Sequence, residues 1–262
     1  MKARTALLCL LLALPRLASA EDEPIATDRP DFVESSDVVG KGRVQLETSL
    51  AWARDRQGPL KTRETSTPTL LRLGIADAWE LRLETDGRMR LTTDDGTGRT
   101  RERGWSDLSF GLKWHQRDGD EATGTPGLGW LFHLDADTGS GPFRGQGVRP
   151  SLRMVAEWEF AGGWSLGVMP GVYRDRDEAG RHFTGGILAA VVGKSLSDRT
   201  RVFVELSGEQ LAAARHGGSV TTLDTGVAYL LSNDVQIDAA VSRGLNRNAP
   251  DWSWTVGLSL RY

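Results

Sequence analysis

The last eleven residues of the chain, 252–262, alternate between apolar and polar positions without a break. One face carries Trp252, Trp254, Val256, Leu258, Leu260 and Tyr262, and the other carries small or charged side chains. Successive side chains of a strand point to opposite faces, so the pattern predicts a strand with one apolar, aromatic-ended surface. A strand of this length can cross a bilayer at a tilt. The pattern is typical of a transmembrane barrel strand, although the edge of a soluble sandwich would alternate similarly.

The same period of two recurs in about twelve segments, which we interpret as strands. They lie near residues 44–52, 71–75, 79–83, 108–114, 128–134, 152–160, 164–168, 183–192, 202–206, 223–229, 235–241 and 252–262. The connections alternate between tight turns and longer polar segments, and we expect the two longest loops at residues 53–67 and 88–104. Exported barrels have short periplasmic turns and long outer loops. The sequence therefore predicts an all-β fold, an antiparallel transmembrane β-barrel of about 12 strands, with both termini on the short-turn side.

Tryptophan placement distinguishes this barrel from a soluble sheet. Eight of the nine tryptophans fall on the phase expected to face lipid, and Trp105 is the exception, which we place at the outer rim or inward. Indole rings prefer the headgroup level, where an apolar ring and a polar N–H are both accommodated. A soluble protein with such a surface would aggregate. The expected membrane girdle comprises Trp52, Trp79, Trp114, Trp158, Trp164, Trp252, Trp254 and Tyr262.

The N-terminus has the organisation of a secretory signal peptide. Lys2 and Arg4 precede the apolar run 6–14, and residues 18–20 supply small side chains for cleavage before Glu21. No later segment is long and apolar enough for a transmembrane helix, which excludes a helical inner-membrane protein. Cys9, the only cysteine, lies inside residues 1–20, so the mature chain is expected to have no thiol chemistry. We expect a cleaved signal peptide at residues 1–20 and a location in the outer membrane of a Gram-negative bacterium.

The composition is consistent with a barrel in which apolar and polar residues alternate along each strand. The chain has 39% apolar residues, 26% charged residues and 31 glycines, so it looks soluble by average hydropathy. Only every second residue of a spanning strand faces lipid, which lowers that average. The formal net charge of −3 provides no basic footprint for nucleic acid, so no nucleic-acid partner is expected. The expected partners are outer-membrane lipid, the outer-membrane assembly machinery and a small-molecule solute.

The phase opposite to the tryptophans carries charges of both signs, which cannot face hydrocarbon. The pore-lining or substrate-contact candidates are Glu47, Arg72, Glu80, Arg82, Glu84, Asp107, Lys113, His133, Arg153, Glu157, Glu205 and Asp238. They can form an ion-pair lattice that stiffens the wall or a constriction that filters by charge and size. If the hairpin around Asp77 pairs symmetrically, Arg72 lies opposite Arg82, with Glu80 and Glu84 diagonal to them. Twelve strands are few for a barrel with an open lumen, so a narrow passage is expected.

Residues 21–42 show no alternation and precede the barrel, which we place at residues 43–262. A loose periplasmic tail is one reading, since termini are often mobile unless tied down. The other is a plug-like segment that folds into the periplasmic mouth and pairs with charges on the wall. The candidates for this role are Asp28, Arg29, Pro30, Asp31 and Glu34.

Motifs for catalysis and metal binding are incomplete. Residues 163–167 match G-x-S-x-G, but a turn enters a strand there, whereas the nucleophile elbow joins a strand to a helix. Residues 135–139 begin like a calcium loop, but Gln146 replaces the glutamate required at the twelfth position. The four histidines lie in separate segments without metal-ligand spacing. We therefore expect no catalytic residues, no metal and no cofactor, and the protein is not expected to be an enzyme.

Several stretches resemble a known family of outer-membrane proteins. They are residues 27–31, read as TDRPD, followed by Glu34-Ser35 and residues 40–47, then DLSFGLKW at 107–114, VFVE at 202–205 and the end at 244–252. With these motifs the chain resembles the MetA pathway of phenol degradation family. The resemblance implies an outer-membrane barrel of the transporter type, often supposed to pass aromatic or other small hydrophobic compounds. Fold transfers between relatives more safely than cargo.

The expected function is therefore an outer-membrane channel or transporter for passive passage of small, aromatic or hydrophobic molecules. Two other classes stay open. One is an outer-membrane barrel enzyme that acts on lipids, and the other is a structural or adhesive barrel whose long loops carry the activity.

Overall fold

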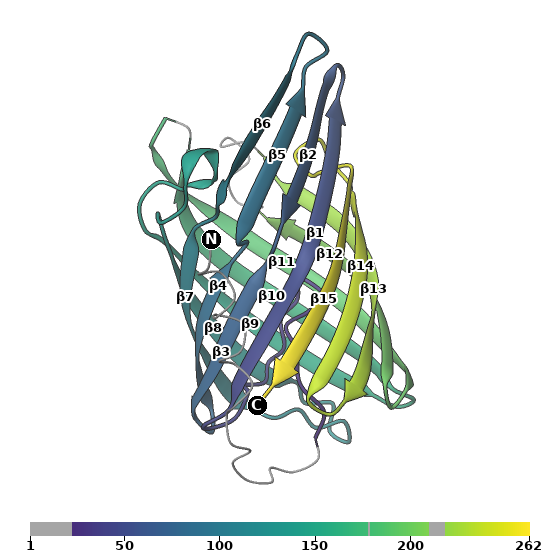
Figure 1. Cartoon of the computed structure of the whole chain (residues 1–262). Coiled ribbons are helices and arrows are strands. Elements are labelled where there is room, and N and C mark those ends of the chain that lie inside the picture. Colours follow the sequence, from purple (N-terminus) through teal and green to yellow (C-terminus); the bar gives the residue numbers. More distant parts are fainter. Residues whose placement is uncertain (1–22, 178, 210–217) are drawn as a thin grey trace, which may run out of the picture.

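Fifteen strands form one continuous antiparallel sheet that closes on itself (Figure 1). The structure is a computed structural model that describes residues 23–177, 179–209 and 218–262, so the expected signal peptide lies outside the described residues. The strands are β1 (Val44–Gln57), β2 (Leu60–Ser66), β3 (Thr69–Ala76), β4 (Trp79–Thr85), β5 (Arg88–Asp94), β6 (Arg99–Trp105), β7 (Leu108–Arg117), β8 (Gly127–Ala136), β9 (Arg149–Phe160), β10 (Trp164–Arg176), β11 (His182–Ser197), β12 (Thr200–Glu209), β13 (Val220–Ser232), β14 (Val235–Gly244) and β15 (Trp252–Arg261). Residues Gly141–Phe143 form a single 3-10 turn, η1.

Pairing of the first and last strands closes the barrel. β1 and β15 pair over ten positions, from Gln45 with Arg261 to Arg54 with Trp252. At the lower end, the Val44 and Tyr262 backbones exchange two hydrogen bonds of 2.8 and 3.0 Å. β1, β3, β4 and β7 to β15 form the wall, so the prediction of a 12-stranded antiparallel barrel is confirmed.

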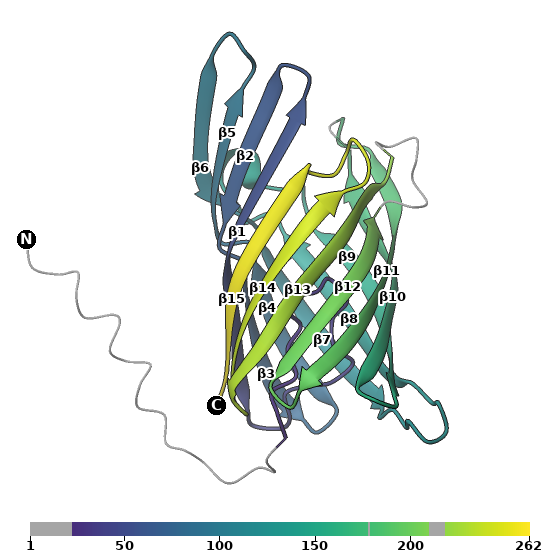
Figure 2. The same ribbon diagram turned by 90° about the vertical axis from the view of Figure 1, so that its right-hand side faces the viewer.

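The remaining strands, β2, β5 and β6, continue β3, β4 and β7 beyond the rim. Together with the upper half of β1 they form a four-stranded sheet that rises above the barrel (Figure 2). The expectation of loops at residues 53–67 and 88–104 was therefore wrong: both stretches are mostly strand. The reason is physical, because a strand outside the bilayer needs no lipid-facing apolar row, and the alternation that reveals spanning strands is absent there.

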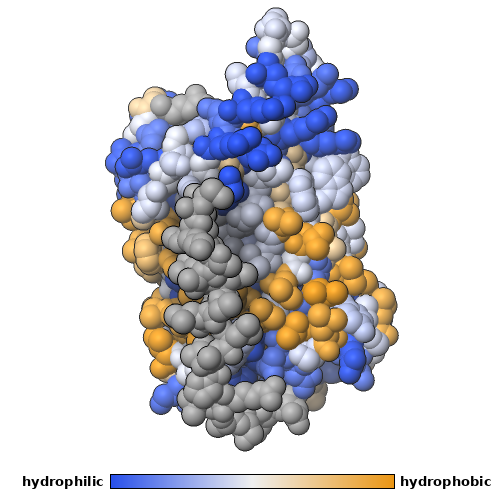
Figure 3. Space-filling model, viewed as in Figure 1, coloured by the Kyte–Doolittle hydropathy of each residue, from blue (hydrophilic) through white to orange (hydrophobic). Residues whose placement is uncertain are grey.

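The outer surface carries an apolar belt (Figure 3), and exposed tryptophans lie at both of its edges. At the lower rim, Trp79 stacks on Trp114 with ring centroids 5.7 Å apart. At the upper rim, Trp52 of β1 pairs with Trp254 of β15, and both are exposed. Across residues 23–177, 179–209 and 218–262, no helix has the length and apolar character needed to cross a membrane. The belt identifies the strands as the membrane-spanning elements.

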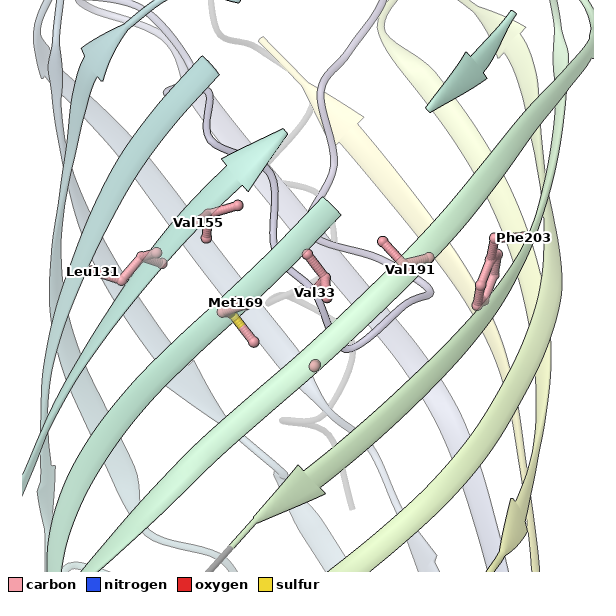
Figure 4. Packing of buried hydrophobic residues seen from close by; sticks show 7 residues of the cluster. Val33, Leu131, Val155, Met169, Val191 and Phe203 are labelled. Atoms are coloured by element: carbon pink, nitrogen blue, oxygen red, sulfur yellow. The ribbon is translucent and has the colours of Figure 1, made fainter. Parts of the chain in front are cut away.

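The interior contains a compact apolar cluster on one side of the wall. Its wall members come from β8 to β12: Leu131, Val155, Met169, Ala189, Val191 and Phe203. Val33 of the N-terminal segment packs against them from inside the barrel (Figure 4). These wall residues have the inward phase, so they fill the lumen and take no part in the lipid-facing belt.

Candidate functional site

The described part of the N-terminal segment, residues 23–42, runs through the lower lumen without regular secondary structure (Figures 2 and 4). Its apolar side chains are enclosed there: Ile25, Val33 and Val39 are at most 5% exposed. Glycines of the wall make room for it. A Cβ at Gly257 would lie 2.7 Å from the Arg29 guanidinium, and one at Gly129 would lie 2.8 Å from the Ser36 carbonyl oxygen. The wall and the segment are therefore closely matched in shape.

Asp28 is the most connected carboxylate of the segment. One oxygen lies 2.5 Å from Arg82 Nη1, and the other lies 3.0 Å from Lys113 Nζ. Arg72 Nη1 lies 3.4 Å from the same carboxylate. The side chains of these three cations are at most 1% exposed. A buried cation without a counter-charge is strongly disfavoured, so Asp28 offsets charges that the wall strands β3, β4 and β7 bring inward.

Glu34 links the segment to two further positions of the wall. Its carboxylate lies 2.6 Å from Arg82 on β4 and 2.7 Å from Arg153 on β9. Two more ion pairs follow the same pattern, Arg29 with Asp238 at 3.1 Å and Asp31 with Arg201 at 2.9 Å. The segment is therefore held from opposite sides of the barrel.

Wall carboxylates also accept hydrogen bonds from the backbone of the segment. Irregular chain has no strand partner for its N–H groups, and burying them unpaired is costly. The pairs that satisfy them are Asp28 N–H with Glu47, Phe32 and Val33 N–H with Glu205, Ser36 N–H with Glu157 and Val39 N–H with Glu80. These predicted pore-lining acids therefore bind the segment backbone.

Arg72 is completely buried at the centre of this network. Its guanidinium lies 2.9 Å from Glu80 and 3.0 Å from Glu47, and it also donates to the Ala26 and Asp37 carbonyl oxygens of the segment. The β3–β4 register pairs Arg72 with Arg82, so the pairing predicted from a symmetric hairpin is confirmed. Two guanidiniums side by side are tolerated because acids surround them.

Two cavities lie above and below the segment. The upper one, of about 560 Å³, has His133 and Arg153 in its lining, together with Glu84, Asp107, Arg149 and Phe143. The lower one, of about 260 Å³, is lined partly by the segment itself, including Ile25, Arg29 and Val33. Arg153 therefore borders the upper cavity and also pairs with Glu34. The segment lies between the two spaces.

Asp107, between β6 and β7, organises the loop that overhangs the upper cavity. It accepts hydrogen bonds from the Gly139 and Gly145 N–H groups at 2.7 and 2.8 Å, and Arg149 lies 2.7 Å away. Desolvation by itself would raise the pKa of Asp107, but these bonds outweigh it and hold the pKa below its ordinary value. The loop therefore depends on an ionised carboxylate.

The structure brings most of the predicted lumen residues to the segment, and Glu84 and Asp107 to the upper cavity instead. Pro30 lies at a bend between Arg29 and Asp31, and each of the four charged residues expected for a plug forms an ion pair with the wall. Sequence reasoning missed Gln236, which donates to Thr27, and the apolar cluster around Val33. The sequence does contain a signal for the apolar cluster, namely large apolar residues on the inward phase of neighbouring strands. Their proximity becomes apparent only when the register of those strands is known.

The G-x-S-x-G match lies in the barrel wall. Ser165, the serine of the G-x-S-x-G match, lies in β10 directly after the turn at 161–163. In the described part of the chain, no group of three or more His, Cys, Asp or Glu side chains is arranged to hold a metal ion. The site consists of a polar wall, an ion-paired segment and two water-accessible spaces.

Solved structures of other outer-membrane barrels share this fold. An outer membrane channel from Pseudomonas putida F1 superposes with a TM-score of 0.64 at 13% identity, covering 87% of this chain and 98% of that one. The beta domain of the Bordetella autotransporter BrkA gives 0.55 at 14% identity, with 84% and 99% covered. The NanC porin gives 0.52 at 9% identity, with 83% and 98% covered. At these identities the likeness establishes the fold.

No curated protein matches the sequence significantly. A family match, in contrast, covers residues 27–262 and so begins inside the N-terminal segment. The chain belongs to the family described as "Putative MetA-pathway of phenol degradation".

Proposed function

We propose that the protein is an outer-membrane channel for passive passage of small molecules, and that the N-terminal segment restricts its lumen. One observation carries the proposal: a segment that is joined to the barrel only at β1, and is otherwise held by ion pairs and hydrogen bonds, lies in the lumen between two cavities. In a barrel with a purely structural role, the side chains of the wall strands could fill the lumen by themselves, as in small barrels. A segment that can move out of the lumen instead leaves a polar passage through the barrel.

The two other classes have weaker support. A lipid-acting barrel enzyme needs a nucleophile, a base and an orienting acid within hydrogen-bond reach, and Ser165 stands in a strand without such a set described around it. An adhesive barrel uses its loops and gives no role to the ion-paired lumen. The solved barrels with this fold include channels and porins, which agrees with transport.

For the cargo we propose a small aromatic compound that carries a hydroxyl or carboxylate group. The family description names phenol degradation. The upper cavity offers Phe143 and Leu108 beside many charged groups, among them Arg149 and Arg153. A bare hydrocarbon would leave those groups poorly solvated, whereas a phenol-like solute satisfies both kinds of surface.

Movement of the segment can be tested by locking it. A Cβ at Gly167 would lie 3.0 Å from Val33 Cγ1, so the double variant Val33→Cys, Gly167→Cys places two thiols within bridging range. The oxidised double variant should show no channel openings in planar bilayers, and a reductant should restore them. Each single variant is the matched control and should be indifferent to redox state. Openings that persist in the fully oxidised protein would contradict gating by this segment.

Passage itself needs a separate measurement. Liposomes that contain the wild-type barrel should take up phenol and benzoate faster than protein-free liposomes, and faster than they take up a hexose. A barrel whose residues 21–38 have been removed should widen that range of solutes. If neither protein accelerates any solute, the channel proposal fails, whatever the locking experiment shows.

A further inference from the structure

The sheet above the rim, formed by β2, β5, β6 and the upper half of β1, has two chemically different faces. Directly paired residues of antiparallel strands point to the same side, so the register assigns each face. One side of the sheet continues the lipid-exposed row of Trp52 and carries nine cations. We call these residues the basic outward face: Arg54, Arg56, Lys61, Arg63, Arg88, Arg90, Arg99, Arg101 and Arg103. All of these side chains are exposed, and Asp94 is the acid among them.

Most of these cations lack a counter-charge. Arg99 lies 3.0 Å from Asp94, and the Arg54 guanidinium lies over the Trp254 ring, 5.6 Å from its centroid. Lys61 lies directly opposite Asp94 in the strand register. For the other six, the described residues provide no ion-pair partner. The strand pairing even places cation opposite cation, as with Arg54 and Arg63, Arg56 and Lys61, and Arg90 and Arg103. Like charges directly opposite each other destabilise a sheet. An anionic partner bound to this face would therefore stabilise the sheet.

The other face of the same sheet is covered at its base. Ser140, next to η1, accepts the Trp105 N–H at 2.8 Å and donates its own N–H to the Trp105 carbonyl oxygen. A Cβ at Gly104 would lie 2.8 Å from the Phe143 ring. The loop therefore packs on the inward side of the sheet and leaves the basic outward face open.

The position of the face relative to the belt indicates its partner. Trp52 and Trp254 mark the upper edge of the lipid-facing surface, and Arg54 follows Trp52 by two residues on the same side. At a rise of about 3.3 Å per residue, Arg54 and Arg56 lie roughly 7 and 13 Å farther along the strand. Figure 3 shows hydrophilic residues over this sheet directly above the apolar belt. That zone is where the headgroups of adjacent lipids lie.

From this arrangement we propose that the basic outward face binds the phosphorylated sugar headgroup of an outer-leaflet glycolipid, as found in lipopolysaccharide. Guanidinium groups match phosphate geometry with paired hydrogen bonds, and adjacent strands space them about 4.8 Å apart. The acyl chains of the same lipid would lie on the belt below Trp52. The partner is thus a molecule with phosphates above and hydrocarbon beneath, which a soluble polyanion does not provide. This inference does not depend on transport.

The test compares two triple variants of equal charge change. Arg63→Gln, Arg90→Gln, Arg101→Gln removes cations of the face, and Lys41→Gln, Arg117→Gln, Arg199→Gln removes exposed cations at the opposite rim. Binding of purified lipopolysaccharide to the detergent-solubilised barrel is measured by titration, with phosphatase-treated lipopolysaccharide as the second probe. Each basic residue near an anionic surface changes affinity about fivefold, so three should change it on the order of 100-fold. The opposite-rim variant should stay within about twofold of wild type.

Three results would overturn the proposal. The first is equal affinity of the wild type and the face variant, with both heat-modifiable and hence folded. The second is undiminished binding after phosphatase treatment. The third is loss of soluble polyphosphate binding by the face variant while lipopolysaccharide binding persists, which would assign the face to a soluble anion.

Discussion

Glu34 of the N-terminal segment lies 2.6 Å from Arg82 of β4, in the interior of a membrane-spanning barrel. The same arginine lies 2.5 Å from Asp28, so two carboxylates of the segment compensate one wall cation. Removing one partner of a buried ion pair typically costs about 3–5 kcal/mol, because the other charge is left without a partner. The family match begins at residue 27 and therefore includes this part of the segment.

Deleting residues 21–38 behind an intact signal should raise single-channel conductance. Asp28, Glu34 and Val33 leave together, and water then hydrates the wall charges that they covered. The wall strands do not change, so the deleted barrel should keep its heat-modifiable migration in SDS gels. Equal conductance of full-length and truncated protein would mean that the segment does not limit flow.

Replacing Arg72 and Arg82 with alanine should shift the channel toward cations. Glu47, Glu80 and the segment carboxylate of Asp28 would lose their closest counter-charges. Negative charge at a narrow point favours cations, so the reversal potential across a salt gradient should move in the cation-selective direction.

A matched control removes two arginines outside the lumen, Arg54→Ala and Arg63→Ala. Both lie on the exposed face of the upper sheet, so selectivity should not change. An unchanged anion-to-cation ratio in a correctly folded Arg72, Arg82 double variant would remove this cluster from the filter.

The sequence predicts the wall strands because every second side chain of a strand that spans the bilayer must be apolar. Together with a symmetric turn around Asp77, that rule is enough to pair Arg72 with Arg82. It does not apply to β5 or β6, which lie in water and carry arginines in place of an apolar row. Nor does it apply to the segment, whose position depends on contacts such as Val33 with Met169 that join distant parts of the chain.

Asp107 should make the outer loop pH-dependent. Its ordinary pKa of 3.8 is lowered in the folded state, so its contribution is fully present above pH 4 and is lost as the pH falls through the lowered value. Protonation weakens the bonds to the Gly139 and Gly145 N–H groups and to Arg149. Pepsin cleavage at Phe143, relative to cleavage of a denatured substrate at the same pH, should therefore accelerate as the pH falls below 4.

The variant Asp107→Asn should be cleaved faster than wild type at pH 4, by on the order of tenfold, since hydrogen bonds to a charged group contribute about 1.5–3 kcal/mol. The difference should shrink as the pH falls, because wild-type Asp107 then loses its charge. Asp137→Asn is the control, because Asp137 is more exposed and pairs with Arg144 alone at 3.2 Å. Wild type and Asp107→Asn cleaved at the same rate at pH 4 would exclude this role of Asp107.

Deleting Tyr262 should reduce the amount of closed barrel in the outer membrane severalfold. Its backbone N–H donates to the Val44 carbonyl oxygen at 2.8 Å, and its carbonyl accepts from the Val44 N–H at 3.0 Å, so the deletion removes the last pair between the first and last strands. An open end exposes unpaired backbone groups at the membrane surface, which bilayers do not tolerate. The variant Tyr262→Phe keeps the backbone pair and the ring, so the heat-modifiable fraction in isolated outer membranes should match wild type. If the deletion also matches wild type, closure does not depend on this residue, and the pairing from Gln45 to Arg54 with β15 is sufficient.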